Sequence, residues 1–77
     1  MRDLGLITSN PTKVRILELL KKRRKADSKT IAKFTRIPEV TLRGVIEELK
    51  RDGFIAEEDG EFRLSSAGLD VLMKMRL

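Results

Sequence analysis

The 77-residue chain contains no cysteine, histidine, tryptophan or tyrosine. Without Cys and His it lacks the thiolate nucleophile, the usual general base and the commonest transition-metal ligands. We therefore expect no enzyme activity, no metal and no other cofactor. Nothing argues for disulfide bonds either, so we expect a cytoplasmic protein.

Long apolar runs and glycine-rich loops are missing as well. No uninterrupted apolar run exceeds three residues, and the N-terminus has no apolar signal-peptide region, so we expect no association with a membrane. The five glycines are scattered, which excludes phosphate-cradling loops of the GxGxxG and GxxxxGK kinds.

Charge is abundant and unevenly distributed. With 40% apolar and 38% charged residues, the chain is typical of one small globular domain, and its net charge is +5. Residues 12–36 contain ten Lys/Arg against two acids, whereas residues 37–62 contain three Lys/Arg against eight acids. This polarity favours an oriented approach to a charged partner.

Apolar periodicity predicts three helices in the first two thirds of the chain. Pro11 suits the first position of a helix over residues 11–24, and Asp27 or Ser28 can cap a second helix that ends near Thr35. Pro38 forces a turn before a third helix that continues to about Asp52, followed by Gly53 as its stop. The expected buried residues are Ile16, Leu17, Leu20, Ile31, Ala32, Phe34, Leu42, Val45, Ile46 and Leu49.

The stretch "FIAEEDGEFRL" predicts a β-hairpin. Asp59 and Gly60 form a dipeptide that favours a two-residue type I′ turn. The resulting register pairs Glu58 with Glu61, Glu57 with Phe62, and Ile55 with Leu64. Alternation then turns the apolar side chains of Ile55, Phe62 and Leu64 toward the helices.

A last helix is expected over residues 66–77, capped by Ser65 or Ser66. We expect Leu69, Leu72 and Met73 to cover the core. Three other apolar residues would then remain exposed and form a homodimer interface, namely Val71, Met75 and Leu77.

The order of these elements, together with two segments, resembles the winged helix-turn-helix family. "TIAKFTRIPEVTLRGVIEELKRDGFI" looks like the signature of that family, and "RLSSAGLDVL" is similar to the segment after the wing in small archaeal and bacterial transcriptional regulators of the MarR and ArsR kind. The resemblance implies a mainly α fold with a small β-hairpin (α+β). The single domain, residues 1–77, would comprise an N-terminal segment (1–10), a three-helix core (11–53), a two-stranded wing (54–65) and a C-terminal helix (66–77).

The same resemblance implies a homodimeric, sequence-specific regulator that binds double-stranded DNA with its third helix in the major groove. The residues implied to read bases are Val40, Thr41, Arg43, Gly44 and Glu47. It also implies that Lys29, Lys33 and Arg36 lie near phosphates. The basic run that ends the first helix either contacts phosphates as well or is a solvated end that complements the helix dipole, and its residues are Lys21, Lys22, Arg23 and Arg24.

Two features leave alternatives open. The wing carries Glu57, Glu58, Asp59 and Glu61, which would repel phosphates, so we expect the wing not to be a main phosphate contact. Gly44 is either a tolerated surface glycine or a point where the backbone approaches a partner. The alternative function is a winged-helix protein–protein docking module of a transcription or replication complex, with the acidic wing as a possible contact to a protein partner.

Overall fold

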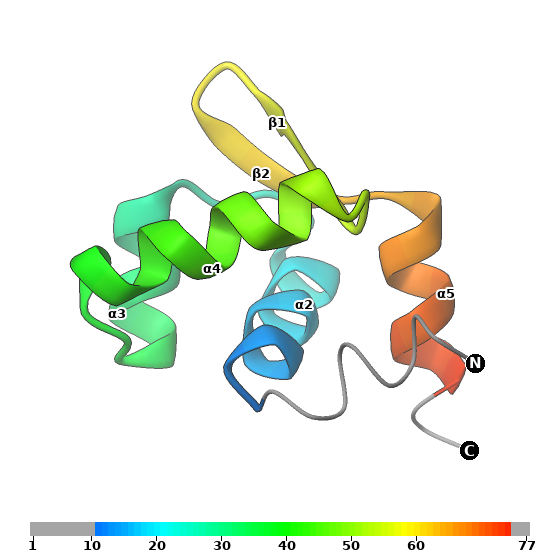
Figure 1. Ribbon diagram of the computed structural model, residues 1–77, viewed down its shortest axis with the longest axis horizontal. Helices are drawn as coiled ribbons and strands as arrows, with labels where there is room; N and C mark the ends of the chain where they lie inside the picture. The colour runs from blue at the N-terminus through cyan, green and yellow to red at the C-terminus, as the bar shows by residue number, and fades with distance from the viewer. Residues whose placement is uncertain (1–10, 75–77) are drawn as a thin grey trace.

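A computed structural model describes residues 11–74, which form an α+β fold of four helices and a two-stranded antiparallel hairpin (Figure 1). The elements, labelled as in Figure 1, are α2 (Pro11–Arg23), α3 (Ser28–Thr35), α4 (Glu39–Arg51), β1 (Ile55–Glu58), β2 (Glu61–Leu64) and α5 (Ser66–Lys74). The segment 1–10 and the residues Met75 and Leu77 lie outside the described range. None of these helices has the length and apolarity needed to cross a membrane.

The helix ends follow from local backbone chemistry. Arg24 adopts a positive φ of 73°, so α2 ends at Arg23, one residue earlier than predicted. The Asp27 carboxylate accepts a hydrogen bond from the Thr30 backbone N–H at 2.8 Å and so caps α3. Arg36, with φ 60°, ends α3, and α4 starts directly after Pro38. The second and third predicted helices and the break between them are therefore confirmed.

The hairpin has the predicted register. Glu58 pairs with Glu61, Glu57 with Phe62, and Ile55 with Leu64. Asp59 and Gly60 both have positive φ values, 54° and 79°, as a type I′ turn requires. On its other side β2 is joined to the α2–α3 connection, because Ala26 and Phe62 exchange two backbone hydrogen bonds of 3.1 and 2.8 Å. The hairpin is thus anchored to the helices by backbone as well as by side chains.

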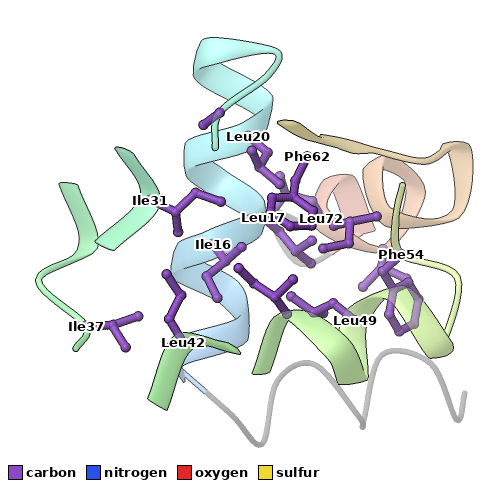
Figure 2. Packing of buried hydrophobic residues seen from close by; sticks show 14 residues of the cluster. Ile16, Leu17, Leu20, Ile31, Ile37, Leu42, Leu49, Phe54, Phe62 and Leu72 are labelled. Atoms are coloured by element: carbon purple, nitrogen blue, oxygen red, sulfur yellow. The ribbon is translucent and has the colours of Figure 1, made fainter. Parts of the chain in front are cut away.

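The core lies around α2, which packs against α3, α4, α5 and β2. Figure 2 shows the buried side chains converging on this helix from the other elements. The buried apolar residues are Ile16, Leu17, Leu20, Ala26, Ile31, Ile37, Leu42, Ile46, Leu49, Phe54, Ile55, Phe62, Val71 and Leu72. Val45, Ala32 and Leu64 are half-buried against this cluster.

The prediction that Phe34 is buried was wrong. Its side chain is 54% exposed, and the neighbouring Thr35 is buried instead. Thr35 lies four residues after Ile31, so both face α2, and the Thr35 hydroxyl donates to the Ile31 carbonyl at 2.6 Å. That hydrogen bond lets a polar side chain occupy the position without an unsatisfied group.

The predicted faces of α5 were wrong for Leu69, Val71 and Met73, although Leu72 is buried as predicted. Val71 is only 5% exposed, whereas Leu69 and Met73 are 38% and 55% exposed. The helix places Gly68 against the Phe54 carbonyl, so Gly68, Val71 and Leu72 face inward. Burial of Val71 removes it from any dimer interface built on exposed apolar residues.

Candidate nucleic-acid interface

The five residues expected to read bases lie on the exposed side of α4. Val40 is 85% exposed, and Thr41, Arg43, Gly44 and Glu47 are exposed as well. Val40, Gly44 and Glu47 follow one another at i, i+4 and i+7, so they share one line along the helix. No atom lies within 4 Å of the point where a Gly44 side chain would begin, so the chain's own packing does not require glycine there. We call these five residues the outer face of α4.

The seven residues expected to contact phosphates are all exposed. They occupy the last turn of α2 and the following residue (Lys21, Lys22, Arg23, Arg24), α3 (Lys29, Lys33) and the residue that ends α3 (Arg36). Within residues 11–74 none of the seven forms a salt bridge with a carboxylate. Their positive charge is therefore available to an external anion.

Arg23 differs from its neighbours because it stacks over an aromatic ring. Its guanidinium carbon lies 4.7 Å from the centroid of the Phe34 ring, a cation–π geometry. The contact joins the end of α2 to α3 and covers part of the exposed ring. This contact was not predicted from the sequence, because the apolar pattern placed Phe34 in the core.

One flank of the outer face is tied to α2. The ammonium of Lys13, a residue that is itself buried, lies 3.1 Å from Glu48 Oε1 on α4. Glu48 is seven residues after Thr41, so both lie on the same flank of α4. The ion pair therefore opposes rotation of α4 about its own axis. Sequence analysis missed it, because the two residues are 35 positions apart.

The opposite flank is tied to the hairpin through Lys50. Its ammonium lies 2.8 Å from Glu57 Oε1 on β1 and 3.4 Å from Glu47 Oε2 on α4. The hydrogen bond to Glu57 is the main reason that the pKa of Lys50 is raised above its ordinary value, and Glu47 adds to the effect. Of the predicted outer-face residues, Glu47 is thus already engaged by a cation of the same chain.

The acids of the hairpin occupy two distinct settings. Glu57 reaches Lys50, whereas Glu58 is 3.9 Å from Arg63 across the strands. Asp59 and Glu61 form no salt bridge with any residue of the range 11–74. Two cations therefore offset the wing acids, Lys50 from α4 and Arg63 from β2.

Figure 1 shows how these parts are arranged around α4. Its N-terminal end lies beside α3, and its C-terminal end leads into the base of the hairpin. The outer face is therefore bordered by the cations of α3 near one end and by the Lys50 contacts near the other. Among the described residues, no group of three or more acids is arranged to hold a metal ion.

No protein-family model matches the chain, and no curated protein matches it either.

Proposed function

We propose that this chain is a winged helix-turn-helix domain that binds double-stranded DNA as a sequence-specific transcriptional regulator. The order of α2, α3, α4, hairpin and α5 supports this assignment, as does the isolated bridge between Ala26 and Phe62, which pairs the α2–α3 connection with the outer side of β2. In this arrangement α3 and α4 form the helix-turn-helix, and α4 is the recognition helix.

In the proposed complex the outer face of α4 enters the major groove. The Arg43 guanidinium suits a bidentate contact to guanine, Thr41 suits a polar contact, and the methyl groups of Val40 suit the methyl group of thymine. Gly44 leaves room for close approach of the helix backbone to base edges. The wing acids make the hairpin a poor phosphate ligand, so the cations of α2 and α3 provide the phosphate contacts.

The observation that carries this proposal is the contrast between cations that are paired with a carboxylate of the chain and cations that are not. Lys13, Lys50, Arg63 and Lys74 each lie within 4 Å of a carboxylate. The seven predicted phosphate ligands have no such partner in the described part of the chain, although the chain contains 12 acids. Exposed cations that stay apart from the chain's own acids favour a polyanionic partner.

Fluorescence anisotropy with labelled random duplex DNA tests the proposal. The logarithm of the binding constant should fall linearly with the logarithm of salt concentration, because each phosphate contact releases counterions. A protein that binds no duplex at low salt would refute DNA binding and favour the docking module, in which the acidic hairpin tip meets a protein partner.

Sequence-specific readout needs a separate experiment. Selection from a random DNA library should yield a different preferred sequence for Arg43→Ala, because base contacts specify the site. Joint neutralisation of Lys21, Lys22, Arg23 and Arg24 to Gln should weaken binding to all sequences alike and reduce the salt slope. Lys74→Ala, on α5, controls for the loss of one positive charge elsewhere. Uniform weakening by Arg43→Ala would make Arg43 a phosphate ligand rather than a base reader.

A further inference from the structure

We infer that Lys50 is a further phosphate ligand of the DNA interface and that its ion pair with Glu57 of the wing weakens this phosphate contact. This inference rests on the proposed DNA binding. The inference extends the proposed function, because it assigns a regulatory role to one wing carboxylate. That carboxylate controls a cation on the recognition helix.

The position of Lys50 on α4 suits a phosphate contact. It follows Arg43 by seven residues, so the two side chains lie on the same flank of the helix, two turns apart. If Arg43 reaches base edges, the DNA backbone that borders the groove passes along this flank. The Lys50 side chain is partly exposed and ends in three N–H donors, so an external phosphate oxygen can reach it.

Two carboxylates of the same chain already bind the Lys50 ammonium. Its ammonium is shared between Glu57 at 2.8 Å and Glu47 at 3.4 Å, and the shorter distance is to the wing. These are the same charge-assisted hydrogen bonds that a phosphate would accept. A phosphate and Glu57 therefore compete for the charge of one ammonium, and the carboxylate of Glu57 weakens the contact that a phosphate makes with it.

Glu57 differs from the other wing acids in its orientation. It is paired with Phe62, so its side chain leaves the sheet on the side that faces the helices. Glu58, the next residue, leaves on the opposite side and lies near Arg63. The two residues therefore form a matched pair, with the same charge and adjacent positions but only one of them bound to Lys50.

The experiment compares Glu57→Gln with Glu58→Gln in the salt titration on random duplex DNA. Both variants lose one negative charge, but only Glu57→Gln removes the closer of the two carboxylates that hold Lys50. We expect Glu57→Gln to bind more tightly than wild type and to steepen the log–log salt slope by about 1. Between about 50 and about 200 mM salt, this variant should lose roughly threefold more affinity than wild type loses. Glu58→Gln should keep the wild-type slope.

Substitution of the lysine completes a double-mutant cycle. In a Lys50→Gln background, Glu57→Gln should have no larger effect than Glu58→Gln has in the wild type, because no ammonium remains to be released. NMR titration without DNA provides an independent measurement, in which the pKa of Lys50 should fall in Glu57→Gln and stay unchanged in Glu58→Gln.

The possible outcomes separate this inference from the proposed function. Equal gains from both glutamate variants would overturn it, since the acids would then act by general repulsion. Unchanged binding by Glu57→Gln, or an unchanged pKa of Lys50, would overturn it as well. In these cases salt-dependent DNA binding by the wild type would leave the proposed function standing. A wild type that binds no duplex DNA would refute both.

Discussion

Individual charged residues organise the surface around α4. Lys13 binds Glu48 of α4, whereas Lys50, itself on α4, binds Glu57 of β1, and the two ion pairs lie on opposite flanks of the helix. Exposed ion pairs contribute little to stability on their own. Their effect here is one of orientation, because each joins α4 to a neighbouring element while Leu42, Ile46 and Leu49 form its buried side.

Asp27 is the residue whose charge is most directly linked to the fold. Thr30 lowers the pKa of Asp27 below its ordinary value. The larger effect comes from the Thr30 side chain, and the next from the hydrogen bond that Asp27 accepts from the Thr30 backbone N–H. A group with a depressed pKa in the folded state stabilises the protein above its unfolded pKa and loses that contribution as pH falls. The stabilisation should therefore be complete at neutral pH and decline below about pH 4.

Urea denaturation at neutral pH and at about pH 3 tests this expectation. Asp27→Ala should lower the unfolding midpoint at neutral pH, because it removes the cap of α3. Asp27→Asn keeps a hydrogen-bond acceptor but does not titrate, so the advantage of the wild type over this variant should shrink on acidification. A difference that is the same at both pH values would contradict a titrating cap.

Sequence reasoning predicted the outer face of α4 but not the contacts that hold it. Exposure of Val40 and Gly44 follows from helical periodicity, which is a local property. The pairing of Lys50 with Glu57 depends on how the hairpin folds back beside α4. Nor does periodicity decide whether Phe34 or Thr35 turns inward, because the hydroxyl of Thr35 is satisfied within its own helix.

At the scale of elements, the hairpin was predictable and the orientation of α5 was not. The Asp59–Gly60 turn and the alternation of the strands determine the register without reference to the rest of the chain. On α5, two different sets of apolar residues have helical spacing. The close approach of Gly68 to Phe54 selects between them, and that contact becomes visible only in three dimensions.

Two alanine substitutions test the packing of these helices. A Cβ at Gly68 would lie 2.1 Å from the Phe54 carbonyl oxygen, so Gly68→Ala must displace α5 and should destabilise the protein by about 3 kcal/mol. A Cβ at Gly44 meets no atom within 4 Å. Gly44→Ala should therefore stabilise the protein by about 0.5–1 kcal/mol, through better helix propensity. Circular dichroism during urea denaturation measures both changes.

Gly44→Ala also tests whether Gly44 takes part in DNA binding, because its effects on stability and on DNA affinity can be measured separately. If the α4 backbone approaches DNA at this residue, Gly44→Ala should weaken DNA binding while it raises stability. Unchanged DNA affinity would make Gly44 a tolerated surface glycine. A Gly68→Ala protein as stable as wild type would contradict the close packing of α5 on Phe54.

At the scale of the whole molecule, charge and apolar exposure are segregated. The seven predicted phosphate ligands lie on α2, on α3 or directly after these helices, whereas Asp59 and Glu61, which form no salt bridge within residues 11–74, lie at the hairpin tip. A separate apolar surface lies on α5, where Leu69 and Met73 are exposed at i, i+4 spacing. We predict that this α5 surface, rather than Val71, mediates a homodimer that presents two copies of α4 to paired half-sites.

Light scattering across a concentration series tests the dimer. The 8.8 kDa chain should give about twice that mass at high concentration, and the dimer should dissociate on dilution by mass action. Leu69→Lys with Met73→Lys should give a monomer that remains folded, because both side chains already lie at the surface. Val40→Lys is the control, since it replaces an even more exposed apolar residue on α4 and should leave the dimer intact. A single-chain mass at every concentration, or dissociation by Val40→Lys as well, would contradict dimerisation through α5.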